Sequence, residues 1–169
     1  MAAPRVLEWI FAFYFLIHVP ITLLFNLQPL LPGVYPAALT DALTWYATKF
    51  KDPLVVNPEP WFQCFLYCEG FLQLFFFPVA AYAFWKGNCK WIRTPVIIYA
   101  THVTTTVVAC LAHILFTDFS NAKVPSPQTL QERLTLSAFY APFLAISLAM
   151  LLFVLFSSAY KPVEKKKKK

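Results

Sequence analysis

The chain has 169 residues, of which 59% are hydrophobic, 18% are aromatic and only 13% are charged. A soluble domain of this size carries about 25% charged residues, so the composition indicates one compact membrane domain without a sizeable soluble part. The net charge of +6 includes five lysines at 165–169, which makes it a feature of the tail and gives no sign of a nucleic-acid surface. The sequence contains no Gly-rich phosphate loop, Cys-x-x-Cys pair or nucleophile elbow.

Residues 9–26 form the first predicted membrane-spanning helix. Their apolar run is longer than the ~7–15 residues of a signal peptide, and no small-x-small cleavage site follows it. His18 lies inside this helix, and it either bonds a neighbouring backbone carbonyl or lines a pocket. Asn26 lies near the end, where it either caps the helix or contributes to the same pocket.

Residues 28–60 form the longest segment that does not span the membrane, because prolines interrupt it repeatedly. Within it, residues 41–51 predict a short amphipathic helix at the membrane surface, with Trp45, Tyr46 and Phe50 on or near one face. Trp and Tyr favour the level of the lipid headgroups. The helix is therefore either an interfacial anchor or a lid over a pocket.

Residues 61–85 predict the second spanning helix, and Glu69 is its single charged residue. At ~1.5 Å per residue this segment can cross a hydrocarbon core of roughly 30 Å. Gln73 lies one turn after Glu69 on the same face. A carboxyl group at this depth costs at least a few kcal/mol unless it faces a partner or a wet cavity. Glu69 should point into the protein, either as a protonated acid that ties two helices together or as the polar floor of a ligand pocket.

The third and fourth spanning helices are predicted at residues 95–116 and 135–156. His102 and Thr106 are four positions apart in the third helix and share a face, which we expect to meet Glu69. Its threonines also have a simpler explanation, since threonine in a membrane helix often bonds back to the preceding turn. Tyr140 lies in the first third of the fourth helix, close to a proline that should kink the helix and widen the bundle.

The basic residues predict the orientation of the bundle. The short loop at 86–93 and the C-terminal tail are both basic, and an even number of helices places them on one side, which should be cytosolic. We therefore predict an all-α membrane protein, a four-transmembrane-helix bundle with a short amphipathic helix in the first lumenal loop and both termini cytosolic. The domain covers 1–160, and a basic tail covers 161–169. Lys166 and Lys167 fit a di-lysine retrieval signal of the endoplasmic reticulum, although a polybasic tail also attracts anionic lipid.

The four cysteines do not form a disulfide framework, because three lie in apolar helices and one in the loop assigned to the reducing cytosol. Cys64 and Cys68 together with His102 could suggest a metal site. Their spacing is helical and no complete ligand set accompanies them. The sequence predicts no metal, no cofactor and no catalytic residue.

Several long stretches resemble the sigma-2 receptor branch of the EXPERA-domain family, which also includes the emopamil-binding sterol isomerase. The similarity covers essentially the whole chain without a large insertion. It is carried by EWIFAFYFLIHVPITL at 8–23, WYATKFKDPL at 45–54, FFFPVAAYAFWKGNCKWIRTPVIIY at 75–99, QERLTLSAFYAP at 131–142 and the lysine tail.

This resemblance implies a receptor of the endoplasmic reticulum membrane, with the nuclear envelope and endolysosomal membranes as further locations. Its pocket would open toward the membrane, bind hydroxycholesterol-like sterols and hydrophobic amines, and regulate cholesterol homeostasis and trafficking. The resemblance also implies a homodimer, and the Niemann-Pick type C cholesterol transporter and the low-density lipoprotein receptor as partners. The ligand-binding positions it implies are Glu69, Asn26, Gln73, His18, Tyr46, Phe50, Tyr99, Thr106 and Tyr140.

One position departs from the family pattern, since Asn26 stands where the sigma-2 branch has an aspartate. A carboxylate forms a charge-assisted bond with an amine that is roughly twice as strong as a neutral one. The Asn26 carbonyl can still accept a hydrogen bond but supplies no charge. We expect tight binding of cationic ligands to suffer, and sterol binding, which depends mainly on apolar burial, to suffer less.

Three classes of function remain open from the sequence. The leading hypothesis is a receptor without catalytic activity. The second is a sterol isomerase, which needs an acid and a base on either side of the sterol ring, and Glu69 with His18 or His102 could supply such a pair. The third is a carrier that moves lipid between leaflets or to a partner, using the same pocket.

Overall fold

The computed structural model describes residues 2–161, and side-chain environments from residue 5 onward. Within this range the chain forms helices and no strands. Four segments are long and apolar enough to cross a membrane, namely Arg5–Leu30, Pro60–Lys86, Lys90–Phe116 and Leu130–Phe156. The predicted all-α architecture with four spanning helices is therefore confirmed. The orientation of the termini and the domain boundaries stay predictions, and Lys166 and Lys167 lie outside the described residues.

The first spanning segment consists of α1 (Ala2–Ile21), a π-helical turn η1 (Thr22–Asn26) and a 3₁₀ turn η2 (Gln28–Leu30). It starts earlier than the predicted residue 9 because the charged residues at its beginning have partners. Arg5 donates to the carbonyl oxygen of Phe84 at 3.1 Å and to that of Trp85. These are backbone groups at the end of another helix that would otherwise lack a partner.

The second spanning segment is also divided by a π-helical turn. It consists of α4 (Pro60–Cys68), η3 (Glu69–Gln73) and α5 (Leu74–Lys86). Proline at the first helical position fits its fixed φ angle and missing N–H group. Gly87 ends the segment at φ 76°, in the left-handed region that favours glycine.

The segment between these two contains α2 (Ala37–Lys49) and the single turn α3 (Pro53–Val56). The amphipathic helix predicted at 41–51 corresponds to α2, which begins four residues earlier. Asp52 caps α3, because its side chain accepts the Leu54 N–H at 3.1 Å.

The last two spanning helices are α6 (Arg93–Phe116), preceded by the short turn η4 (Lys90–Ile92), and α7 (Leu130–Phe156), followed by η5 (Ser158–Tyr160). The helix α7 starts five residues before the predicted residue 135. Its first turn is polar but well capped, since Thr129 and Glu132 form a capping box.

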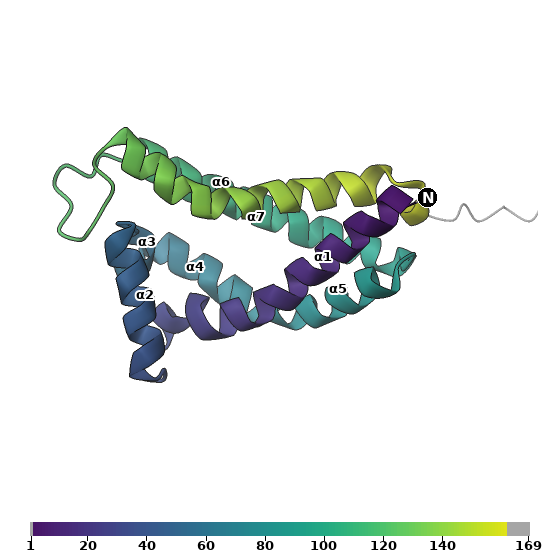
Figure 1. The fold of residues 1–169 in the computed structure, drawn as a ribbon, viewed down its shortest axis with the longest axis horizontal. Coiled ribbons are helices and arrows are strands. Elements are labelled where there is room, and N and C mark those ends of the chain that lie inside the picture. Colours follow the sequence, from purple (N-terminus) through teal and green to yellow (C-terminus); the bar gives the residue numbers. More distant parts are fainter. Residues whose placement is uncertain (1, 162–169) are drawn as a thin grey trace, which may run out of the picture.

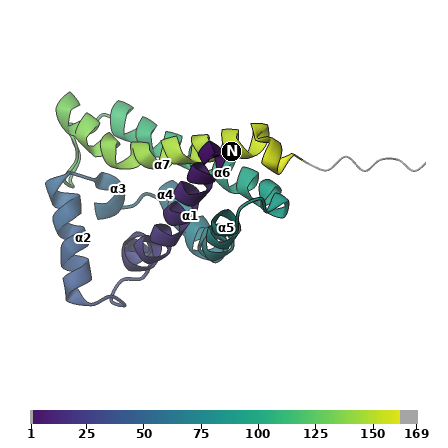
Figure 2. The ribbon, with the colours of Figure 1, turned by 45° about the vertical axis from the view of Figure 1, so that its right-hand side comes forward.

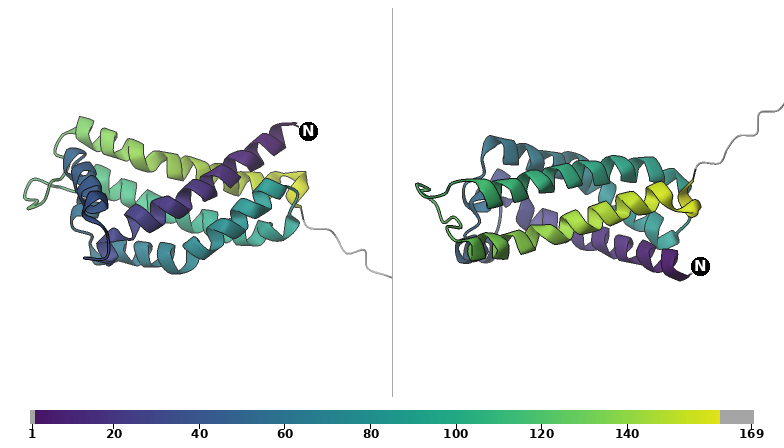
Figure 3. Two further views of the ribbon diagram at one scale, coloured as in Figure 1. Left: turned by 60° about the horizontal axis from the view of Figure 1, so that its bottom comes forward. Right: turned by 90° about the horizontal axis from the view of Figure 1, so that it is seen from above.

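The spanning helices are arranged in two pairs, with α1 packed along α5 and α6 packed along α7. In Figure 1 the pairs lie close together at the end that carries the N-terminus and diverge toward α2 and α3. Figures 2 and 3 show that α2 lies across the diverging end. The antiparallel contact of α6 with α7 is fixed at its two ends, where Arg93 donates to the Val154 carbonyl at 3.2 Å and Arg133 donates to the Ile114 carbonyl at 2.9 Å.

Two hydrophobic clusters hold this arrangement together. The larger one joins both helix pairs at the converging end, and its fully buried members include Phe11, Phe77, Phe84, Val96 and Met150. The smaller one lies near α3 and consists of Leu54, Phe62, Leu66, Cys110, Ile114 and Leu136. The space between the two clusters is not filled by side chains, and it contains the candidate site.

Candidate functional site

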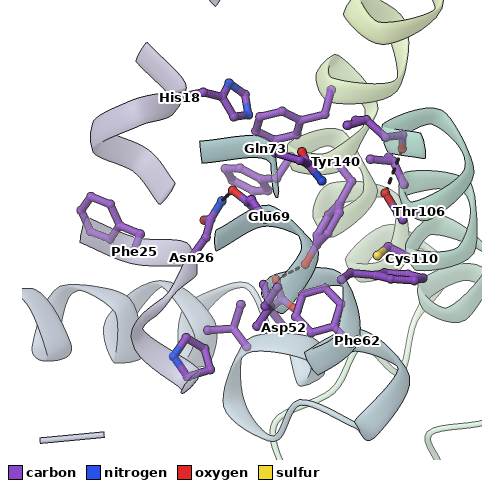
Figure 4. Close-up of a pocket in the computed structure, with 18 of the residues that line it drawn as sticks. His18, Phe25, Asn26, Asp52, Phe62, Glu69, Gln73, Thr106, Cys110 and Tyr140 are labelled. Atoms are coloured by element: carbon purple, nitrogen blue, oxygen red, sulfur yellow. Dashed lines mark hydrogen bonds between the residues drawn. The ribbon is translucent and has the colours of Figure 1, made fainter. Parts of the chain in front are cut away.

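A cavity of about 460 Å³ lies between the diverging helix pairs (Figure 4). Its walls come from α1, η1, η2, α2, α3, the α4–η3 segment, α6 and α7. Most of its lining is aromatic or aliphatic, which is typical of sites for small apolar ligands. The polar side chains that line it are His18, Asn26, Asp52, Glu69, Gln73 and Thr106, together with the hydroxyl-bearing Tyr14, Tyr46, Tyr99 and Tyr140.

The first polar group of the cavity centres on Glu69 at the start of η3. Two side chains of η1 donate hydrogen bonds to its Oε1 atom, the Thr22 hydroxyl and the Asn26 amide, the latter at 2.8 Å. Within residues 2–161, no hydrogen bond goes to Oε2, which keeps accessible surface. Glu69 thus has one oxygen held by protein donors and one left for another partner.

The two π-helical turns bring these residues together. Such turns are rare and frequently occur at functional sites, and here η1 and η3 contact each other. Gly70 allows the close approach, because a Cβ atom at this position would lie 3.0 Å from the Leu27 side chain. The wide turns cannot be read from the sequence, since the apolar pattern of both segments fits an ordinary α-helix.

The second polar group centres on Asp52, which the sequence analysis missed. Its side chain is fully buried, and its Oδ2 atom accepts the Tyr140 hydroxyl at 2.9 Å and the Tyr46 hydroxyl at 3.2 Å. Burial raises the pKa of the Asp52 carboxyl, although the hydrogen bonds from Tyr140, Leu54 N–H and Tyr46 act in the opposite direction. The signal was an acid directly before proline, which is typical of a helix N-cap. Figure 4 shows Asp52 and Glu69 in different parts of the cavity.

His18 fits both interpretations that the sequence left open. Its Nδ1 atom lies 3.2 Å from the carbonyl oxygen of Tyr14, and its side chain also lines the cavity. A carbonyl oxygen only accepts, so Nδ1 carries the proton and the neutral ring has its acceptor lone pair on Nε2. The aromatic rings of Phe77 and Phe143 pack edge-on against the imidazole.

Eight of the nine predicted ligand-binding residues line the cavity, and their role in binding stays a prediction. They are His18, Asn26, Tyr46, Glu69, Gln73, Tyr99, Thr106 and Tyr140. Phe50 is the exception, since it is not part of the lining. Its ring packs at 5.4 Å from Tyr46 and 4.5 Å from Phe139, two residues that are. Phe50 therefore supports the wall.

The expectation that His102 shares the cavity face with Thr106 is wrong. The residues of α6 that line the cavity are Tyr99, Val103, Thr106, Val107 and Cys110. At about 100° per residue, position 102 lies roughly 80° around the helix from the centre of this stripe. The His102 Nε2 atom is buried and has no hydrogen-bond partner among the described residues. Thr106 bonds back to the Val103 carbonyl at 3.1 Å, as threonine in a membrane helix often does.

The helix α2 contributes to the cavity wall through Ala42, Leu43 and Tyr46. Trp45, on the neighbouring position, is 59% exposed, and Lys49 lies 4.6 Å above its ring. The same short helix thus covers one side of the cavity and presents an exposed indole, so both roles, interfacial anchor and lid, stay predictions.

Comparison with known proteins places the chain in a family. Its sequence matches the family model EXPERA (EXPanded EBP superfamily) over residues 38–154. The chain belongs to the EXPERA family. The family resemblance seen in the sequence is therefore confirmed, and the matched range includes nearly all of α2, the second and third spanning segments and nearly all of α7.

Three relatives show how the similarity is distributed. Sigma intracellular receptor 2 of Xenopus tropicalis is 55% identical over 166 residues, covering 98% of this chain and 97% of the relative. Sigma intracellular receptor 2 of Homo sapiens is 52% identical, with complete coverage of both chains. Efficient mitochondria targeting-associated protein 19 of Schizosaccharomyces pombe is 24% identical, covering 85% of this chain and 72% of the relative. The first two relatives are named receptors.

Proposed function

We propose that this EXPERA protein is an intracellular membrane receptor that binds hydroxycholesterol-like sterols and hydrophobic amines in the cavity between its helix pairs. The observation that carries the proposal is Glu69, a carboxyl group in the middle of a spanning segment that lines an apolar cavity with its Oε2 atom unpaired among the described residues. A polar group at this depth needs a partner. A ligand with one polar group and a large apolar body supplies that partner.

The size and lining of the cavity favour ligands of this kind. Pockets for drug-sized molecules have volumes of about 300–1,000 Å³ and a few convergent polar groups in a mainly apolar wall. The cavity has about 460 Å³, and its rings and aliphatic side chains would bury the apolar body. A sterol hydroxyl would bond with Glu69 Oε2. A second polar group on the ligand would find the Asp52–Tyr140 pair or the lone pair of His18 Nε2.

An amine would use the same oxygen. An ammonium group donating to an ionised Glu69 forms a charge-assisted bond, and the Asn26 amide already donates to the other oxygen. Because Asn26 supplies no negative charge, Glu69 would be the single anion at this point of the cavity. We therefore expect amines to bind this chain more weakly than they would bind a chain with two acids there.

The wider physiological role is proposed by resemblance and from the relatives' receptor names. The protein would reside in the endoplasmic reticulum membrane and regulate cholesterol homeostasis and trafficking. Its partners would be the Niemann-Pick type C cholesterol transporter and the low-density lipoprotein receptor, and it would form a homodimer. Replacing Lys166 and Lys167 by serine tests the location, since loss of a retrieval signal should move the protein out of the endoplasmic reticulum.

A second candidate, a sterol isomerase, is favoured by the presence of two carboxyl groups in one cavity. Glu69 and Asp52 could act as acid and base if they faced opposite sides of one sterol ring. In the structure each carboxyl is held by its own neighbours, Thr22 and Asn26 for Glu69 and two tyrosines for Asp52. Incubation of the purified protein with a labelled unsaturated sterol separates the candidates, because a receptor returns the sterol unchanged and an isomerase returns a shifted double bond.

The receptor function is tested by direct binding. The parent chain, Glu69→Gln and the control Glu59→Gln are purified in lipid nanodiscs and titrated with a labelled hydroxysterol and a labelled hydrophobic tertiary amine. Glu59 is exposed and bonds to the Trp61 ring N–H outside the cavity. We expect Glu69→Gln to weaken the binding of both ligands and Glu59→Gln to leave the binding of both unchanged. Unchanged affinities in a folded Glu69→Gln protein would show that this carboxyl is only structural.

A further inference from the structure

Thr22 is the first residue of η1, and its side chain is fully buried. It does not line the cavity, so it cannot touch a ligand there. Its hydroxyl nevertheless donates to Glu69 Oε1, the same oxygen that accepts the Asn26 amide. Thr22 thus reaches the candidate site through one carboxyl group.

Because both donors bond to Oε1, they determine whether Oε2 donates or accepts a hydrogen bond. An oxygen that accepts two hydrogen bonds acts as the acceptor oxygen of the carboxyl group, so in the neutral acid the proton lies on Oε2. In this form Oε2–H donates to a hydroxyl or keto oxygen of a ligand. In the ionised form Oε2 has its lone pairs free for an ammonium group. The two donors therefore direct Oε2 toward the ligand in either form.

The two forms do not depend equally on Thr22. A hydrogen bond to an ionised acceptor is about twice as strong as one between neutral groups. The Thr22 hydroxyl therefore supports the carboxylate, which an ammonium ligand requires, more than it supports the neutral acid, which suffices for a sterol. Because Asn26 carries no charge, the hydroxyl and the amide are the two protein donors that stabilise a negative charge on Glu69 among the described residues.

We propose that Thr22 is a positioning residue that sets, through Glu69, the preference of the cavity for amines over neutral sterols. This inference rests on the proposed receptor function and adds a determinant of its specificity. Thr22 is suited to this role because both its backbone position and its side-chain environment are fixed. The π-helical turn η1 places it against η3, and its side chain is completely buried.

The experiment compares amine and sterol affinities in three variants of the full chain in nanodiscs. Thr22→Val removes the hydroxyl at nearly constant shape, and Thr22→Ser keeps it. Thr105→Val is the control, since Thr105 is exposed and bonds only to the Thr101 carbonyl of its own helix. We expect Thr22→Val to lower the affinity for the tertiary amine roughly tenfold, which is the effect of losing one hydrogen bond to a charged group. The hydroxysterol should lose less than about threefold, and Thr22→Ser should restore the ratio of the two affinities.

Several outcomes would overturn the inference. Equal losses for amine and sterol in Thr22→Val would assign Thr22 a purely structural role, and an unchanged amine affinity would assign it none. A parent chain that binds the sterol but no amine would also overturn it, because Glu69 would then accept no cation. In the first two cases the receptor function stands, and in the third case only its sterol-binding part stands. A parent chain that binds neither ligand would instead refute the receptor function itself, and this inference with it.

Discussion

Tyr160 and Glu8 join the two ends of the chain, because the Tyr160 hydroxyl donates to Glu8 Oε1 at 2.6 Å across 152 positions of sequence. Both side chains are buried, with 0% and 4% exposure. Glu8 also accepts from Arg5 at 2.9 Å and from the Asn88 N–H at 3.2 Å. A single carboxyl group thus connects α1, the loop after α5 and the short turn η5 that follows α7.

Tyr160→Phe should destabilise the protein by about 1–3 kcal/mol, because it leaves a buried carboxyl oxygen short of one donor. The measurement is thermal unfolding in a mild detergent. Tyr82→Phe is the control, since Tyr82 is 59% exposed, and it should change the unfolding temperature little. Equal effects of the two changes would contradict the importance of the Tyr160–Glu8 bond.

Gly87→Ala should be more damaging than Gly33→Ala. Both glycines have a positive φ angle, 76° and 80°, so both substitutions carry a backbone strain of about 1 kcal/mol or more. Only at Gly87 would the new Cβ atom also overlap a neighbour, at 2.0 Å from Arg5 Nη1, whereas Gly33 has nothing within 4 Å. Denaturation of the two variants under one condition gives the difference. A similar loss at both positions would show that Arg5 moves aside without cost.

Asp52→Asn should change how stability depends on pH. The raised pKa of Asp52 means that, above its ordinary value of 3.8, the folded chain holds a proton that the unfolded chain has released. The parent therefore loses stability as the pH rises from about 4 through this window. The variant lacks this loss, so its stability relative to the parent should increase with pH.

Asp118→Asn provides a contrast of opposite sign for the same measurement, thermal unfolding between about pH 4 and pH 7. The backbone N–H of Ser120 holds the pKa of Asp118 below its usual value. Its stabilising contribution is present above 3.8 and is lost as the pH falls. A parallel pH dependence of both variants would contradict the assignment of a raised pKa to Asp52.

Asn26→Asp should increase the affinity for a hydrophobic amine, by roughly tenfold or more, because it adds a second acid at the point where Glu69 lies. The same change should lower the stability of the empty protein, since two neighbouring acids repel one another when both are charged. Titration with a labelled amine and unfolding without ligand test the two effects. Asn57→Asp, at an exposed position outside the cavity, should show neither.

The four spanning helices could be predicted from the sequence because long apolar runs are a direct consequence of the thickness of a bilayer. The ends predicted at 85, 116 and 156 lie within one residue of the observed ends, but the starts of the first helix and of α7 could not be predicted. The first helix and α7 both begin with polar residues, Arg5 and Glu8 in one case and Glu132 in the other. Each of these finds a partner at a helix end. Such partners come from distant parts of the chain or from capping, and a hydropathy pattern contains neither.

The candidate site could be predicted in part. Glu69 was recognisable because an isolated ionisable group in a membrane-spanning segment is costly unless it has a partner or a function. Asp52 was not, since it lies in a polar loop, and its burial and its bonds to the tyrosines of α2 and α7 appear only in the folded chain. The spacing of His102 from Thr106 predicted that both lie on the cavity face. Residues four positions apart lie about 40° apart around a helix, so one of them can line a cavity while the other lies beside it.

The π-helical turns make the cavity sensitive to the number of residues in each spanning segment. A turn of this kind contains one residue more than the α-helical turn it replaces. Deleting one residue from Glu69–Gln73 would let the segment become a continuous α-helix, still long and apolar enough to cross the bilayer. Because the wide turn needs one residue more to complete the same rotation, the helical parts before and after the deletion would keep nearly the same relative orientation. A one-residue deletion should therefore preserve insertion into the membrane and the packing of the flanking helices, while it removes the widened turn that brings Glu69 to Thr22 and Asn26.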